Sequence, residues 1–247
     1  DKATGDVVWK ASDELASYAS PVAAAIEGRP WCFVFARGGL VGLHPLTGKV
    51  DFVYPWRAKI LESVNASTPV VVGDEVFISE TYGPGSSLLR VRPGAYDVVW
   101  QDDRRRRQKA FLAHWSTPIH VDGYLYGCSG RNSPDAELRC VDWRTGKVMW
   151  SDDNAIQSSL LYVDGHFVCL EEYGRLRLLK VNPARCEVVS EMDLSNWGPR
   201  STAKKGASRR LLEYPCWAAP ILAHGLLYLR GKDRLVCLEL IPELDAD

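Results

Sequence analysis

The chain has 247 residues, of which 46% are hydrophobic and 25% are charged. This composition is typical of a globular protein with a sizeable core, and it excludes a disordered or fibrous chain. The 30 Lys and Arg residues nearly balance the 31 Asp and Glu residues, so no overall field directs the molecule to nucleic acid or to an anionic membrane surface. No apolar run approaches the roughly 20 residues that a membrane-spanning helix needs. We therefore expect no transmembrane segment and no binding of nucleic acid.

One pattern recurs along the chain at intervals of roughly 40 to 60 residues. Each copy opens at a Ser/Thr-Pro pair or a degenerate form of it, namely Ser20-Pro21, Thr68-Pro69, Thr117-Pro118, Ser159-Leu160 and Ala219-Pro220. The last interval is long because a polar, basic insert spans residues 196–210. A period of this length is typical of a repeat protein in which each copy is one supersecondary unit.

A tight turn follows the first apolar stretch of each copy. Asp122-Gly123 and Asp164-Gly165 stand between apolar stretches, and His224-Gly225 occupies the same place in the last copy. Asp-Gly favours a two-residue hairpin because both central positions of a type I′ turn need a positive φ. We therefore predict two antiparallel strands at the start of each copy, and a role for His224 as a turn residue.

A third and a fourth strand complete each copy. The third strand is predicted in runs such as 138–141, and the fourth follows a Thr-Gly turn and ends on an aromatic residue, as in Thr145-Gly146 to Trp150. Trp9 and Trp100 end two other copies. A single four-stranded sheet cannot bury both of its faces, so we expect these rings to fill the seams between stacked sheets.

Four short antiparallel strands in each copy predict an all-β protein, a β-propeller of four-stranded antiparallel blades, with about five blades present. The blades are expected over the ranges 1–10 (outer strand only), 17–56, 65–103, 114–153, 156–194 and 215–241. Residues 1–9 either pair with 234–240 to close the ring, which removes an open sheet edge, or complete a blade that lies upstream of the chain.

The cysteines and histidines indicate packing and turns rather than chemistry. The seven cysteines are scattered and form no C-x-x-C pair, which argues against zinc and against a disulfide framework. Most alternate with apolar residues, as Cys237 does within 235–238, where a cysteine is expected to behave as a small buried hydrophobe. The five histidines show no metal-ligand spacing. We predict no metal site and no catalytic residue.

The segment Val141-Asp142-x-x-Thr145-Gly146-x-x-x-Trp150 resembles the signature of pyrroloquinoline-quinone-like (PQQ-like) propeller repeats, and residues 1–9 provide a second copy. The similarity extends over essentially the entire chain. This family includes quinoprotein alcohol dehydrogenases, the BamB-type propeller of outer-membrane assembly and secreted bacterial repeat proteins. The resemblance implies one propeller domain over 1–247, the C-terminal portion of a longer chain with about seven or eight blades. It also implies a periplasmic or extracellular location.

The resemblance leaves two functions open, because a fold does not specify an activity. The first is a non-catalytic scaffold that binds a protein, peptide or glycan through its rim loops, as a monomer and without a cofactor. The alternative is a PQQ- and calcium-dependent quinoprotein dehydrogenase domain, which in this family uses two adjacent cysteines and Glu, Asn and Asp ligands. No two cysteines are adjacent in this chain, and no stretch matches those ligand motifs. We therefore favour the scaffold.

The candidate ligand contacts lie just before each copy opens, where the chain crosses one rim of the central channel. They are Tyr18, Asn65, His114, Trp115, Gln157 and Trp217. Aromatic rings, amides and a histidine that converge on one funnel suit a small ligand or a peptide. In the other interpretation, Trp115 and Trp217 simply plug the channel.

The run from Arg104 to Arg107 is the strongest local charge feature, and Asp102 and Asp103 precede it. One interpretation is a contact with an anionic partner. The other, which we favour, is a solvated loop that the neighbouring acids neutralise. The basic insert at 196–210 is interpreted in the same way.

Overall fold

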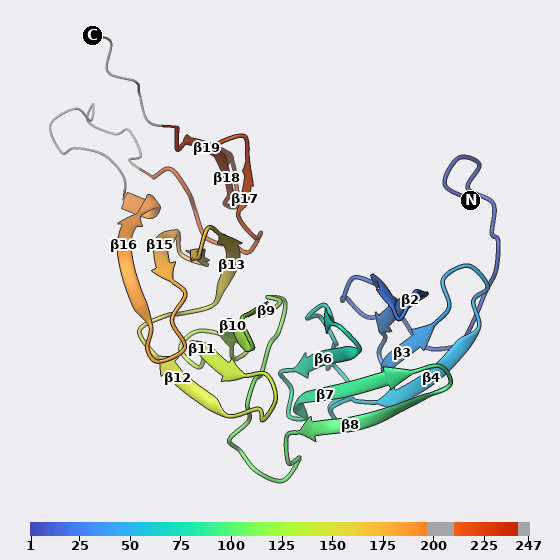
Figure 1. Cartoon of the computed structure of the whole chain (residues 1–247). Helices are drawn as coiled ribbons and strands as arrows, with labels where there is room; N and C mark the ends of the chain where they lie inside the picture. The colour runs from blue at the N-terminus through green and yellow to red at the C-terminus, as the bar shows by residue number, and fades with distance from the viewer. Residues whose placement is uncertain (197–209, 242–247) are drawn as a thin grey trace, which may run out of the picture.

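The computed structural model describes residues 1–196 and 210–241. Five antiparallel sheets lie side by side and form an open arc (Figure 1). Four sheets have four strands and the last has three, each in simple up-and-down order. The first strand of each sheet lies on the inside of the arc and the last on the outside, as in the blades of a propeller (Figure 1). The predicted all-β propeller architecture is confirmed.

The strands are short, as expected for blades. The first sheet contains β1 (Val22–Ile26), β2 (Arg29–Phe35), β3 (Gly39–Leu43) and β4 (Val50–Pro55). The second contains β5 (Val70–Val72), β6 (Glu75–Glu80), β7 (Gly85–Arg92) and β8 (Ala95–Gln101). The third contains β9 (Ile119–Val121), β10 (Tyr124–Ser129), β11 (Glu137–Asp142) and β12 (Val148–Asp152). The fourth contains β13 (Ser158–Val163), β14 (His166–Glu171), β15 (Arg175–Lys180) and β16 (Glu187–Asp193), followed by the short 3₁₀ turn η1 (Leu194–Asn196). The fifth contains β17 (Ile221–Ala223), β18 (Leu226–Arg230) and β19 (Leu235–Glu239).

The first hairpins have the turns that the sequence predicts. Asp122 and Gly123 have φ values of 48° and 83°, and Asp164 and Gly165 have values of 46° and 73°. His224 has a φ of 52° between β17 and β18, so this histidine is a turn residue. Two successive positive φ values match the right-handed twist of the flanking strands and fix their register.

The outer hairpin of every four-stranded sheet has the same irregularity. The pairing of the third and fourth strands shifts between Gly42 and Leu43 in the first sheet and between Cys140 and Val141 in the third. The second and fourth sheets shift at equivalent points. A bulge increases the local twist of a strand pair, and the repeated shift gives each sheet the same twist for stacking on its neighbour.

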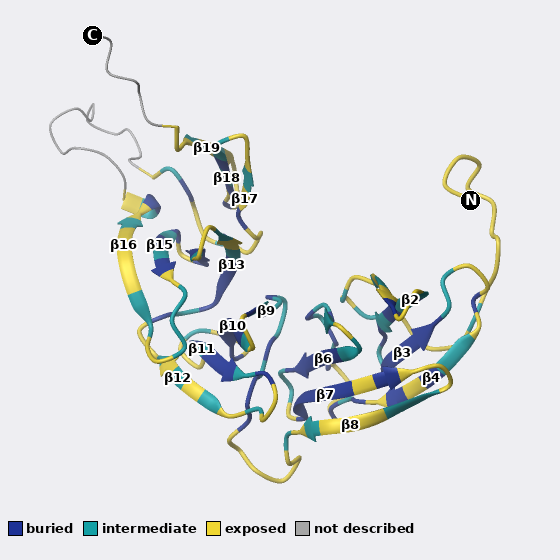
Figure 2. Cartoon of the chain, viewed as in Figure 1, coloured by how far each residue is buried: buried dark blue, intermediate teal, exposed yellow. Residues whose placement is uncertain are grey.

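The core consists of layers between adjacent sheets rather than one central cluster. Phe33 and Tyr54 of the first sheet pack with Ile78 and Leu89 of the second, and similar clusters lie at each later seam. Figure 2 shows the same distribution: β6, β7 and β10 are mostly buried, whereas β16 is largely exposed and β8 and β12 consist of exposed and intermediate residues. Each sheet is therefore stabilised mainly by its neighbours, as in other repeat proteins.

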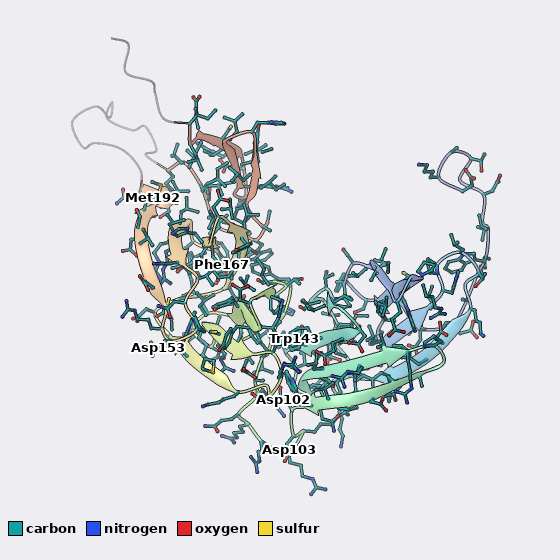
Figure 3. The ribbon with its side chains drawn as sticks, in the orientation of Figure 1. Asp102, Asp103, Trp143, Asp153, Phe167 and Met192 are labelled. Atoms are coloured by element: carbon teal, nitrogen blue, oxygen red, sulfur yellow. The ribbon has the colours of Figure 1, made fainter. Side chains whose placement is uncertain are left out.

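Tryptophans at the ends of outer strands fill the seams, which confirms the role predicted for them. The indole N–H of Trp100 donates to the carbonyl of Trp143 at 2.8 Å, and Trp143 lies where the second and third sheets meet (Figure 3). The Trp100 ring lies on Gly146, where an added Cβ would be only 2.8 Å from it. Trp150 repeats the arrangement one sheet later and donates to the carbonyl of Asn182 at 2.9 Å.

Residues 1–10 form no strand in the structure, so the predicted pairing with 234–240 is wrong, whereas the alternative, completion of another blade, stays a prediction. They do not pair with β19, and Figure 1 shows the N-terminus and β19 at opposite ends of the arc. A strand requires a neighbouring ladder, and no described strand lies beside this segment. Trp9 nevertheless makes the seam contact: its indole donates to the carbonyl of Pro45 at 3.0 Å, and its ring lies on Gly48.

The cysteines are free thiols, and Cys128, Cys140, Cys169 and Cys216 are buried as expected. Cys237 is exposed, so burial of this cysteine was wrongly predicted. It points from the face of the fifth sheet that has no described neighbour, and an alternating pattern does not show which face of a strand is covered. Within the described ranges, no helix is both long and apolar enough to span a membrane.

Candidate ligand-binding rim

One edge of the arc collects most of the loops that separate sheets. Because the strands are antiparallel, the turn between the second and third strands lies at the same end of a sheet as the connection to the next sheet. We call this edge the rim. Three clefts open along it, lined by residues of the first sheet, the first two sheets and the fifth sheet respectively.

Four aromatic side chains from three loops meet on the rim. Trp115 and Trp217 have ring centroids 6.0 Å apart, Trp217 meets Tyr214 edge-on at 6.1 Å, and Tyr214 stacks on Tyr173 at 4.8 Å. We call Trp115, Trp217, Tyr214 and Tyr173 the aromatic row. Tyr173, Trp217 and Tyr214 are 51%, 49% and 44% exposed, so the row offers ring surface to solvent rather than only plugging a channel.

A buried carboxylate lies against the aromatic row. Glu172 is 6% exposed, and it accepts a hydrogen bond from the indole of Trp217 at 3.1 Å and one from the hydroxyl of Ser133 at 2.7 Å. Both are hydrogen bonds from neutral donors to a charged acceptor, which are stronger than neutral pairs. They fix the plane of the Trp217 ring, so the exposed ring is held in one orientation.

The adjacent Glu171 belongs to a buried ion network rather than to the row. Arg175 binds it through two nitrogens at 2.8 Å each. Arg177, which is 4% exposed, lies between Glu171 at 3.4 Å and Asp152 at 2.7 Å. Burial raises the pKa of Glu171, and the two arginines oppose that rise. This network connects the third and fourth sheets, since Asp152 belongs to β12 and its partner Arg177 to β15.

Two of the predicted contacts are structural. The side-chain amide of Asn65 donates to the carbonyls of Ala36 and Trp56 at 2.7 and 3.2 Å. Gln157 donates to the carbonyl of Gly130 at 2.6 Å. Both amides are only 2% exposed, and each holds the turn of the preceding sheet. Because they are buried and bonded to the backbone, these two amides are not accessible to a ligand. The sequence did not reveal this, since the position of a residue in a loop does not show which way its side chain points.

Tyr18 and His114 lie at other points of the rim. Tyr18 is 77% exposed and lines the cleft of the first sheet, away from the aromatic row. His114 accepts or donates a hydrogen bond with the Tyr82 hydroxyl at 3.4 Å, and Arg131 lies over the Tyr82 ring at 4.6 Å. Burial, with a smaller effect of Arg131, lowers the pKa of His114, so the neutral ring is favoured. Tyr18 and Asn65 meet through the backbone, where the Tyr18 N–H donates to the Asn65 carbonyl at 3.1 Å. Trp115 and Trp217 are the predicted contacts whose side chains meet.

Sequence reasoning missed Tyr173, Tyr214, Glu172 and Ser133. Tyr173 follows two acidic residues in the turn after β14, and Tyr214 precedes Trp217 by three residues. Only the pair Tyr214 and Trp217 offered a signal in the sequence. Two aromatic residues so close together in one connection indicate a loop with exposed ring surface. The basic insert falls almost entirely outside the described residues.

Within the described ranges, no three His, Cys, Asp or Glu residues lie close enough together to hold a metal ion. The chain also has no adjacent cysteines.

Antiparallel sheets stacked face to face around an arc, with loops gathered on a rim, define a β-propeller repeat protein. The family model described as outer membrane protein assembly factor BamB matches residues 1–152, which is more than half of the chain. The chain therefore belongs to this PQQ-like propeller family.

Solved structures show the same fold at low sequence identity. BamB from Moraxella catarrhalis is 13% identical, with a TM-score of 0.58, over 94% of this chain and 60% of that one. Quinohemoprotein alcohol dehydrogenase ADHIIG from Pseudomonas putida HK5 is 11% identical, with a TM-score of 0.59, over 93% and 43% of the two chains. The enzyme from Comamonas testosteroni is 10% identical, with a TM-score of 0.58, over 93% and 44%.

The chain thus spans about 60% of the BamB structure and less than half of either dehydrogenase. At these identities the similarity defines the fold alone. No curated protein sequence matches the chain.

Proposed function

We propose that this chain is a non-catalytic propeller scaffold that binds a protein, peptide or glycan partner at its rim, outside the cytoplasm. The observation that carries the proposal is the aromatic row, where three large rings stay about half exposed at the meeting point of separate loops. Exposed Trp and Tyr provide much contact area at a low entropic cost and are frequent hot spots of binding surfaces.

The surroundings of the row support recognition rather than catalysis. The Glu172 carboxyl group accepts hydrogen bonds from Trp217 and Ser133, and it thereby orients the Trp217 ring at the surface. Beside Trp217, a cleft of about 300 Å³ is lined by Arg230 and Lys232. A ligand could therefore stack on the rings and place polar groups toward these two cations. Family membership supports the location, because the matching model describes an outer membrane assembly factor.

The test is selection of defined probes, an immobilised glycan array and a displayed peptide library, by wild-type protein and by Trp217→Ala and Tyr214→Ala. Loss of a hot-spot ring is expected to weaken a selected probe by about tenfold or more. The matched control is Tyr162→Ala, because Tyr162 is 43% exposed but lies on β13 away from the row. Equal binding by all variants would refute a role for the aromatic row.

A second measurement separates the scaffold from the dehydrogenase alternative. The protein is titrated with PQQ and calcium while tryptophan fluorescence is followed, and dye-linked alcohol oxidation is assayed. The proposal predicts neither stoichiometric quenching nor turnover. Stoichiometric quenching together with turnover would contradict the scaffold proposal and support the dehydrogenase alternative.

A further inference from the structure

A second cleft on the rim, at the junction of the first and second sheets, has a chemistry different from that of the aromatic row. Its volume is about 210 Å³. The connection from β4 to β5 contributes residues 57–60, the turn between β6 and β7 contributes residues 82–84, and the loop after β8 contributes Arg104. Three separate loops therefore build one site, which we call the basic cleft.

The basic cleft has an excess of positive charge that the protein does not neutralise. Arg57, Lys59 and Arg104 line it, and among the described residues none of the three lies within ion-pair distance of a carboxylate. Arg57 and Arg104 make only long hydrogen bonds to backbone carbonyls, at 3.4 and 3.3 Å. Most of their donors are thus available to a ligand, and a guanidinium is suited to bind a carboxylate through two nitrogens.

A buried carboxyl group lies behind these cations. Glu80, the last residue of β6, is 1% exposed, and neither of its oxygens has a hydrogen-bond partner of normal geometry. Arg104 and Arg57 are the charges that act on it. One carboxyl against three cations leaves a net positive cleft whether Glu80 is ionised or neutral, so an anion is the ligand that the site favours.

Arg104 differs from Arg106 of the same basic run in its contacts. The Asp102 carboxylate accepts backbone N–H groups from Ser86 at 2.7 Å and Ala110 at 2.8 Å, and so joins the two ends of the loop (Figure 3). The Arg104 guanidinium lies over the ring of Trp56, 4.9 Å from its centroid. Arg106, by contrast, has an 80% exposed side chain and pairs with Asp103.

The rest of the lining is apolar. Ala58, Ile60 and Pro84 contribute to the walls together with the ring of Tyr82, and Ile60 is 49% exposed. We infer that the basic cleft binds an organic carboxylate that carries an apolar group, with the carboxylate at Arg57 and Arg104 and the apolar group against Ile60 and Pro84. A small aromatic acid and the C-terminal end of a polypeptide share this chemistry.

The test is calorimetric titration at constant ionic strength with hippurate and with hippuramide, its uncharged amide. Hippurate is expected to bind, and hippuramide to bind at least about tenfold more weakly, because it lacks the charge-assisted hydrogen bonds. Arg57→Gln and Arg104→Gln should each weaken hippurate by about tenfold. Arg106→Gln is the matched control, since it removes the same charge from the same loop outside the cleft, and it should retain wild-type affinity.

Three results would overturn the inference: equal binding of hippurate and hippuramide, an equal loss in Arg106→Gln, or sulfate binding as tightly as hippurate. The last would show that the apolar walls contribute nothing. Arg57→Gln provides an independent test if Arg104→Gln does not fold, and the melting temperature of each variant reports folding. Trp217→Ala should leave hippurate binding unchanged, so failure of the aromatic row and failure of the basic cleft are distinguishable.

An acetylated tripeptide ending in phenylalanine, with a free or an amidated terminus, then identifies the source of the carboxylate. Tighter binding of the free acid than of hippurate assigns the cleft to polypeptide ends. Weaker binding assigns it to small acids. If the free and the amidated tripeptide bind equally and hippurate binds weakly, both assignments, to polypeptide ends and to small acids, are contradicted.

Discussion

Glu80 shows how the stack of sheets changes the chemistry of a single side chain. Burial raises its pKa from 4.5 to about 7, although Tyr82, Arg104 and Arg57 oppose the rise. The folded chain therefore holds a proton between pH 4.5 and 7 that the unfolded chain has released. The contribution of Glu80 to the free energy of unfolding falls as the pH rises through this window, and this contribution is constant above it.

Glu80→Gln should accordingly stabilise the protein in a pH-dependent way. The gain at pH 8 is expected to be on the order of 2 kcal/mol. It should be much smaller at pH 4.5, where the folded state is protonated and the unfolded state is half protonated. Urea unfolding of wild type and variant at the two pH values measures it. Glu191→Gln, at an exposed position of β16, is the control. An equal effect of Glu80→Gln at both pH values would contradict the prediction.

Arg177 is the side chain on which the buried ion network depends. Its loss would leave Asp152 without its cation and Glu171 with one partner fewer. Arg177→Met is expected to lower the free energy of unfolding by about 3–5 kcal/mol, because an unpaired charge remains buried. Arg175 binds the same Glu171, but its side chain is 35% exposed, so Arg175→Met should cost clearly less. The denaturation midpoint compares the two variants, and equal losses would show that burial of the arginine is not decisive.

The seam between adjacent sheets is the unit that holds the strands together. Trp100 and Trp9 make the same hydrogen bond and lie on equivalent turn glycines. Trp100, however, ends a strand of a complete sheet, whereas Trp9 belongs to a segment without strand pairing. We therefore expect the contact of Trp100 to contribute more to the free energy of unfolding than the contact of Trp9.

Trp100→Ala should lower the free energy of unfolding by about 2–3 kcal/mol, since it removes a half-buried ring from the second seam. Trp9→Ala should cost less than about 1 kcal/mol, because the segment around it can move away without opening a sheet. Chemical unfolding followed by circular dichroism compares the two. Similar losses would mean that the N-terminal segment is as firmly packed as a blade.

The five sheets together form a linear stack, in which the buried clusters join adjacent sheets. Trp115 and Trp217 add a contact between the segments that lead into the third and fifth sheets. In the described part of the chain, the fifth sheet has one neighbour, and its other face exposes Ile221 at 62% and Leu235 at 66%. In such a stack, stability is approximately a sum over repeats and interfaces. The terminal sheet should therefore open before the middle ones.

Native-state hydrogen exchange should show this order. Amides of β6, β10 and β14 should exchange most slowly, and those of β17 to β19 should exchange at least about tenfold faster, because opening the fifth sheet disrupts one interface instead of two. Mass spectrometry of exchanged peptides resolves the sheets. Uniform protection would show that the stack unfolds as a single cooperative unit.

The strands, hairpins and seams could be predicted from the sequence because each depends on local rules. Asp122-Gly123 and Asp164-Gly165 mark turns by their own backbone preferences, and Trp100 and Trp150 recur at the same point of the repeat. The position of residues 1–10 could not be predicted, because pairing depends on a neighbouring strand rather than on the segment itself. The exposure of Cys237 has the same origin, since alternation fixes two faces but not their neighbours.

The sequence by itself therefore determined the repeat, the class of fold and the edge on which the loops between sheets gather. Only the tertiary structure decided that Tyr173 and Tyr214 join Trp217, that Asn65 and Gln157 turn inward, and that Arg104 alone of its run faces a cleft. The physical reason is distance along the chain. These groups come from loops of different sheets, and their meeting is set by the stacking of the sheets, which no local pattern encodes.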